Sequence, residues 1–305
     1  MTLKDQVVKN IVSRVLRSKD YRIEIVNLIN AEFLQFAVDF FKKVCEAKLN
    51  SDDITIDWYK EAFLDRSLPS DEIAINSGLN KKTISNMYRS ATKSIVIDAS
   101  NEHFDSLYES IQTLVENEPE IDLTLTVKFN SVSVDLNVSE SLIVINTLAV
   151  KRAALRGGAW STAGKRAEKY LMLTLCKLYK VEPQYYNAEH FVRDRTLDVD
   201  REIDFYLKNG SNQYKCEVKL MGQGNPESAD AIIARDSKVF VADTLSQQNK
   251  NQCDQLGVSW VACRDEEGYK RFKDVLIRFE IPFEDYCGNL DEDLASILDD
   301  VFNVQ

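Results

Sequence analysis

The sequence predicts an α/β (α+β) fold, in which a mainly helical N-terminal region is followed by an α/β half. Residues 1–65 place apolar side chains such as Val8, Ile11 and Val15 at helical spacing. From about residue 150, helical patterns alternate with short apolar runs typical of strands. A chain with 44% hydrophobic and 29% charged residues fits a folded globular protein. We therefore divide the chain into residues 1–150 and 151–305.

The individual elements follow from the same patterns, taken in chain order. Period-two alternation over 121–138 predicts a hairpin, and Ser139 with Glu140 marks the start of a helix running to about Leu155. We expect Gly157-Gly158 to end that helix. Beyond it the pattern predicts a helix over Ala163 to Tyr179, a hairpin over 201–219, a helix around 226–235, a strand Val239–Ala242, a helix around 245–255 and a strand Val258–Cys263.

Charge is unevenly distributed along the chain. The net charge is −11, but no Lys or Arg follows Arg278, so much of the acidity lies in a C-terminal tail. Residues 151–169 hold six basic side chains against the single acid Glu168. Because local fields matter more than the sum, the acidic total does not exclude a polyanionic partner.

Cysteine spacing and hydropathy indicate the compartment. The six cysteines form no Cys-x-x-Cys pair, which favours free thiols in a reducing cytoplasm. No apolar run approaches the roughly 20 residues that span a bilayer. We therefore expect a soluble cytoplasmic protein without a membrane partner.

A helix-turn-helix is predicted at residues 70–90. Ala74, Gly78 and Ile84 fall at the offsets needed for close helix approach, a left-handed turn and packing of the second helix. The outward side chains of that second helix are types that contact phosphates and base edges. They are Lys81, Lys82, Ser85, Asn86 and Arg89. The alternative is an αα-corner with a solvated basic face.

The segment 157-GGAWSTAGKRAEKYLMLTLC-176 resembles a phosphate loop but does not match one. Five residues separate Gly158 from Gly164 where the loop has four, and Arg166 replaces the magnesium-binding Ser or Thr. We interpret the segment as a helix with Glu168 beside its buried face. Alone, it is also compatible with an ordinary amphipathic helix that exposes its Glu.

The stretch 201-REIDFYLKNGSNQYKCEVKLMG-222 carries charges within two apolar runs. Asn-Gly at 209–210 predicts a hairpin turn, and Glu217 and Lys219 then share one face of the second strand. Asp204 lies on the first strand. The alternative to a functional site is a cross-strand ion pair on a solvated sheet face.

Asp204 followed by Glu217-Val218-Lys219 matches the signature of the PD-(D/E)XK nuclease fold. The surrounding order also fits, because a helix with an acid precedes the hairpin and a helix and strand follow it. Region 155–263 resembles type II restriction endonucleases, and the runs GGAWS, GKRAEK and EVKLMGQGNPE look most like the CfrBI group. Ile203 stands where the Pro of the signature would be. The resemblance says little about residues 1–150.

The resemblance implies a Mg²⁺-dependent homodimer that hydrolyses both strands of a short palindromic DNA site, with a DNA methyltransferase as the partner enzyme of a restriction-modification system. Asp204 and Glu217 would hold the metal through carboxylate oxygens, with Lys219 and Glu168 completing the catalytic set. DNA contacts are expected from the N-terminal recognition and dimerisation region and from Arg156, Lys165, Gln223 and Asn225, in addition to the second helix of the helix-turn-helix.

Two other functions remain open from the sequence. One is a non-catalytic helix-turn-helix regulator whose charged hairpin is structural, and the other is a nuclease of another role, such as mismatch or junction cleavage. Other chemistries fit poorly, because His103 and His190 are the only histidines and no Gly-x-Ser-x-Gly elbow occurs.

Overall fold

The structure, a computed structural model, describes residues 3–50, 52–79, 81–120, 123–129, 132–187, 205–220 and 236–303. Contacts divide the chain into two compact units, Met1–Leu28 with Trp160–Gln305 and Ile29–Ala159. We call them the sheet unit and the helical unit. The expected boundary at residue 150 therefore differs from the observed one, because the first helix joins the C-terminal half.

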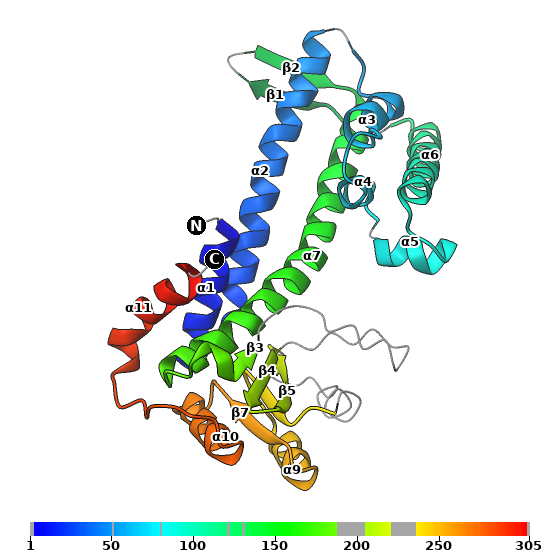
Figure 1. The fold of residues 1–305 in the computed structure, drawn as a ribbon. Helices are drawn as coiled ribbons and strands as arrows, with labels where there is room; N and C mark the ends of the chain where they lie inside the picture. The colour runs from blue at the N-terminus through cyan, green and yellow to red at the C-terminus, as the bar shows by residue number, and fades with distance from the viewer. Residues whose placement is uncertain are drawn as a thin grey trace. The chain divides into compact units, whose positions relative to one another are not determined.

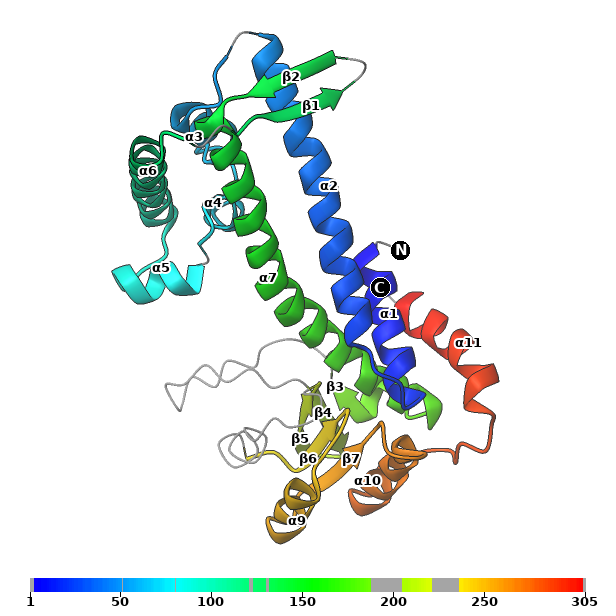
Figure 2. The ribbon, with the colours of Figure 1, turned by 180° about the vertical axis from the view of Figure 1, so that it is seen from behind.

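The sheet unit contains a five-stranded mixed sheet (Figures 1 and 2). The strands, in spatial order, are β3 (Tyr186–Asn187), β4 (Phe205–Asn209), β5 (Asn212–Lys219), β6 (Val239–Ala242) and β7 (Ser259–Ala262). The pairs β3–β4 and β4–β5 are antiparallel, whereas β5–β6 and β6–β7 are parallel. The mixed α+β fold predicted from the sequence is confirmed.

The predicted hairpin joins β4 to β5. Asn209 pairs with Asn212, and Gly210 in the turn has a φ of 57°, a conformation that glycine adopts without strain. Phe205 and Leu207 are buried on one strand, and Cys216 and Val218 are buried on the other. The first residues of the predicted hairpin, 201–204, and the predicted helix at 226–235 lie outside the described residues.

The sheet unit also contains helices. They are α1 (Leu3–Leu16), the first turns of α2 (Arg22–Leu49), the C-terminal part of α7 (Val138–Leu178), α9 (Gln247–Gln255), α10 (Phe272–Arg278) and α11 (Leu290–Asn303), with short 3₁₀ turns at Pro183–Tyr185 and Gly268–Arg271. Sequence analysis placed the helix at 245–255 and both final strands close to their observed positions. All six cysteines are free thiols.

The acidic C-terminal segment is an ordered helix that docks on α1, where we had expected a tail (Figures 1 and 2). Leu294 and Leu298 are buried, so α11 has an apolar face in addition to its acids. Asp291 accepts a hydrogen bond of 2.7 Å from Arg17, and Asp299 pairs with Lys9. The charge pattern alone did not predict this amphipathic helix.

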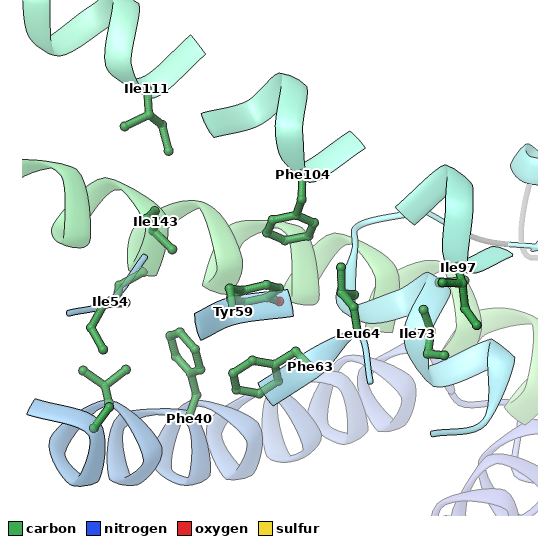
Figure 3. Packing of buried hydrophobic residues seen from close by; sticks show 14 of the residues in the cluster. Phe40, Ile54, Tyr59, Phe63, Leu64, Ile73, Ile97, Phe104, Ile111 and Ile143 are labelled. Atoms are coloured by element: carbon green, nitrogen blue, oxygen red, sulfur yellow. The ribbon is translucent and has the colours of Figure 1, made fainter. Parts of the chain in front are cut away.

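The helical unit is built around an aromatic core (Figure 3). Its elements are the remainder of α2 and α7 together with α3 (Ile56–Phe63), α4 (Ser70–Asn76), α5 (Lys81–Tyr88), α6 (Lys93–Asn117), β1 (Leu125–Phe129) and β2 (Val132–Leu136). Tyr59 stacks on Phe63 and Phe104, with ring centroids 4.8 and 4.3 Å apart. The strands β1 and β2 form the predicted hairpin, in which Val127 pairs with Val134.

Helix α7 runs without interruption through Gly157-Gly158, so the predicted break there is wrong. A glycine costs a helix only about 1 kcal/mol relative to alanine, and no proline accompanies this pair. The helix begins at a reciprocal cap: the Glu140 amide donates to the Asn137 side chain at 3.0 Å, and the Asn137 amide donates to the Glu140 carboxylate at 2.9 Å.

Within the described part of the chain, no helix combines the length and the hydrophobicity needed to cross a bilayer.

Candidate active site

The charged residues of β5 form a close pair. Lys219 Nζ lies 3.1 Å from Glu217 Oε1, and the Glu217 side chain is only 2% exposed. Residues two apart on a strand share a face, which brings these two side chains together. Because Glu217 is buried, the alternative of an ion pair on a solvated sheet face is wrong for this carboxylate.

The pair lies at the carboxyl ends of the parallel strands. Lys219 is in register with Ala242 of β6, and Ala242 is in register with Ala262 of β7. In sheets with parallel strands, this edge is where ligands commonly bind. Asp243, directly after β6, is fully buried, and its Oδ2 lies 3.7 Å from Arg264 Nη1.

Glu168 approaches the same edge from α7. Its Oε1 accepts a hydrogen bond of 3.1 Å from the Leu220 amide, directly after Lys219. Glu168 is 7% exposed, so the alternative of an ordinary helix with an exposed Glu is wrong. The resemblance implied that Glu168 belongs to the catalytic set, and the structure brings its carboxylate to the end of β5.

Tyr21 adds a group from the N-terminal segment. It lies between α1 and α2 and is 3% exposed. Burial raises the pKa of its hydroxyl well above the ordinary value, and the nearby carboxylates of Asp243 and Glu168 raise it further. Tyr21 therefore stays protonated at neutral pH.

Sequence reasoning missed Tyr21, Asp243 and Arg264. For Asp243 a signal was present, because a charged residue directly after a predicted buried strand lies at the strand's carboxyl end. Tyr21 offered no such signal, since it reaches this edge only through packing of the N-terminal segment onto the sheet unit.

The described residues supply part of a donor set for a divalent metal. Glu217 provides carboxylate oxygens, the donor type that Mg²⁺ prefers. Over the described ranges, however, no group of three or more His, Cys, Asp or Glu side chains could hold a metal ion. Asp204, the predicted second ligand, lies outside the described residues, as do Gln223 and Asn225.

The predicted helix-turn-helix corresponds to α4 and α5 in the helical unit. Ala74 and Ile84 are fully buried, and Gly78 between the helices has a φ of 80°. A Cβ on Gly78 would lie 2.4 Å from Val150 Cγ1, so the turn also lacks space for a larger residue.

The predicted DNA-contacting side chains differ in their environments. Lys82, Ser85, Asn86 and Arg89 are exposed. Lys81 instead pairs with Asp71 at 2.9 Å, which ties α5 to α4. Arg156 is exposed in the helical unit, and Lys165 is exposed in the sheet unit.

Comparison with known proteins identifies the family. A family model described as CfrBI restriction endonuclease matches residues 5–250, a stretch that includes α4, α5, Glu168, Asp204, Glu217 and Lys219. No curated protein and no solved structure matched the chain. Because the family match covers most of the chain, the protein belongs to the CfrBI restriction endonuclease family and is a type II restriction endonuclease, a site-specific endonuclease of DNA.

Proposed function

We propose that this endonuclease hydrolyses both strands of a short palindromic DNA site in a Mg²⁺-dependent reaction, using Asp204, Glu217 and Lys219. The observation that carries the proposal is the buried Glu217 carboxylate, 3.1 Å from the Lys219 ammonium. Burying a carboxylate is costly, and such costs are concentrated at functional sites. Family membership supplies the reaction class.

The strand register supports Asp204 as the partner of Glu217. Phe205 of β4 pairs with Cys216 of β5, and Asp204 and Glu217 are the next residues in sequence beyond that pair. Two carboxylates from adjacent strands would hold Mg²⁺. When bound, this ion would supply Lewis-acid polarisation of the scissile phosphate.

Lys219 acts beside this carboxylate pair in the proposed reaction. Its side chain is 30% exposed, so Lys219 is accessible from solvent while its ammonium remains next to Glu217. From this position it would donate a hydrogen bond to the attacking water and offset negative charge that develops on the phosphate. Glu168 completes the described part of the site.

DNA recognition is assigned to the exposed face of α5. The exposed side chains are Lys82, Ser85 and Asn86 of α5 and Arg89, which directly follows the helix, and together they combine charge for phosphates with amide and hydroxyl groups for base edges. A palindromic site has twofold symmetry, which favours a homodimer. A DNA methyltransferase of the same specificity would protect the host genome.

The test is cleavage of a mixed-sequence plasmid pool in Mg²⁺, followed by sequencing of all DNA ends. We expect ends at one repeated short sequence, lost with EDTA and lost in Asp204→Ala and Glu217→Ala, while both variants still bind site-containing DNA. Random ends would indicate a non-specific nuclease. Absence of ends with Mg²⁺ or Mn²⁺, together with specific binding, would instead favour a DNA-binding regulator.

A further inference from the structure

The peptide group that joins Lys219 to Leu220 is hydrogen-bonded on both sides. Its carbonyl, from Lys219, accepts a bond of 3.3 Å from the Asp243 amide, and its amide, from Leu220, donates a bond of 3.1 Å to Glu168 Oε1. One bond comes from the backbone after β6 and the other from a side chain of α7. The backbone that carries the Lys219 side chain is therefore fixed by two different elements.

Glu168 supplies a side-chain partner for a backbone amide at a strand end. Lys219 is the last residue of β5, and its pairing with Ala242 is the last described pair between β5 and β6. A buried carboxylate is stabilised by hydrogen bonds from backbone amides. The buried Glu168 carboxylate thus provides a hydrogen-bond acceptor for the Leu220 amide, one residue beyond the last described pair of the sheet.

We propose that Glu168 is a positioning residue of the nuclease site, which holds Lys219 in place by accepting a hydrogen bond from the Leu220 amide. The inference rests on the proposed function of Lys219 and changes the role expected for Glu168, because the residue acts through the peptide and does not need to touch DNA or metal.

Asp243, whose amide donates to the Lys219 carbonyl, is itself held by hydrogen bonding and charge. The Asp243 carbonyl accepts a bond of 2.8 Å from the Arg264 amide, so Asp243 is held between β5 and β7. Its buried carboxylate faces the Arg264 guanidinium. Tyr21, from the N-terminal segment, is buried, and the charges of Asp243 and Glu168 raise the pKa of its hydroxyl.

Two substitutions separate positioning from direct catalysis. Glu168→Gln keeps an oxygen acceptor for the Leu220 amide but removes the charge, whereas Glu168→Ala removes both. A metal ligand or a general base depends on the charge, so both variants would then fail alike. A positioning residue depends on the acceptor, so the glutamine variant would recover most of the activity that the alanine variant loses.

The experiment measures single-turnover cleavage, DNA affinity and thermal unfolding for both variants, with Glu266→Ala, which removes an exposed carboxylate of the sheet unit, as the matched control. We expect Glu168→Ala to lose roughly a hundredfold in rate, the scale of a misplacement of about 1 Å, with unchanged DNA affinity. Glu168→Gln should lie within about tenfold of wild type by the same reasoning, and Glu266→Ala should match wild type. Equal loss in both Glu168 variants, or no loss in Glu168→Ala, overturns the proposal.

A second readout does not depend on cleavage. Amide hydrogen exchange of a peptide covering the end of β5 should show Leu220 exchanging roughly tenfold faster in Glu168→Ala, with protection restored in Glu168→Gln. Unchanged exchange overturns the hydrogen-bond role even if cleavage falls. If the wild-type protein cuts no DNA, the proposed function itself fails, and the catalytic purpose of the contact fails with it. A wild-type protein that cuts while Glu168→Ala cuts equally fast refutes the positioning role alone.

Discussion

Lys219 Nζ lies 3.1 Å from Glu217 Oε1, yet the two side chains differ in burial, with 2% of Glu217 and 30% of Lys219 exposed. The carboxylate has lost nearly all of its solvent, whereas the ammonium keeps part of its hydration. Removing either partner therefore has a different consequence for the other. Loss of its ammonium partner is costly for a buried carboxylate, whereas a partly exposed ammonium that loses this carboxylate can turn towards water.

We predict opposite stability effects for two variants that both lose activity. Lys219→Ala should lower the free energy of unfolding by roughly 1–3 kcal/mol, because the Glu217 charge loses a compensating partner. Glu217→Gln should leave stability unchanged or raise it, because a buried charge is removed. Both should lose several orders of magnitude in single-turnover cleavage. Urea unfolding and rapid-quench kinetics measure the two properties.

The control for this pair is Lys215→Ala, which removes a lysine from the same strand, two residues before Glu217. It should cut DNA at the wild-type rate. If Lys219→Ala also cleaved normally, the catalytic role of Lys219 would be rejected. A larger loss of stability in Glu217→Gln than in Lys219→Ala would contradict the argument from burial.

A further prediction concerns the exposed face of α5 and Arg89, which directly follows this helix. Lys82→Ala combined with Arg89→Ala should weaken DNA binding and reduce the slope of log affinity against log salt by about one to two, since each phosphate contact releases condensed counterion. Titrations at several salt concentrations give the slope. Lys43→Ala with Lys128→Ala removes the same charge from exposed positions on α2 and β1. An equal change of slope in that control would mean that the effect comes from net charge and not from these two positions.

The predictable parts of the fold are those encoded locally. The hairpin of β4 and β5 follows from alternation and an Asn-Gly turn, and the α4–α5 pair follows from Ala74, Gly78 and Ile84. Both patterns lie within short stretches of sequence. The resemblance placed Glu168 in the catalytic set with Glu217 and Lys219, but it did not reveal the hydrogen bond from the Leu220 amide.

The features that sequence did not reveal depend on contacts between distant segments. Tyr21 reaches the candidate site because residues 1–28 pack with residues 160–305. The acidic segment after Arg278 forms α11 because Leu294 and Leu298 find a buried surface on the same unit. No local pattern specifies the partner of either segment. Hydropathy and charge therefore predict only a helical N-terminal region and an acidic C-terminal tail.

Substitution of its two exposed glycines tests directly whether α7 is continuous. Gly157 and Gly158 are exposed, and an added Cβ at either would meet no atom within 4 Å. Alanine at each position should therefore raise the free energy of unfolding by about 0.5–1 kcal/mol, because it lowers the entropy cost of helix formation. Chemical denaturation measures the change. Destabilisation by either alanine would show that the helix is interrupted there after all.

The last prediction concerns Glu140, which joins three segments of the helical unit. Its Oε1 accepts hydrogen bonds from Lys48 Nζ at 2.8 Å and from the Ile54 amide at 2.9 Å, and its Oε2 caps α7 through Asn137. Burial by itself raises the pKa of Glu140. The hydrogen bonds from Lys48, Ile54 and Asn137 outweigh burial, and the pKa lies below its usual value of 4.5.

A carboxyl group with a lowered pKa in the folded state stabilises the protein above its unfolded pKa and loses that contribution as the pH falls through the folded pKa. Glu140→Gln should therefore cost roughly 1.5–3 kcal/mol at pH 7, the range for hydrogen bonds to a charged group. The difference from wild type should shrink below about pH 4.5 as Glu140 takes up a proton. Urea unfolding from pH 7 to pH 3 measures it, with Glu109→Gln on the exposed surface of α6 as the matched control. A difference that stays constant over this range would mean that the Glu140 charge contributes nothing to the fold.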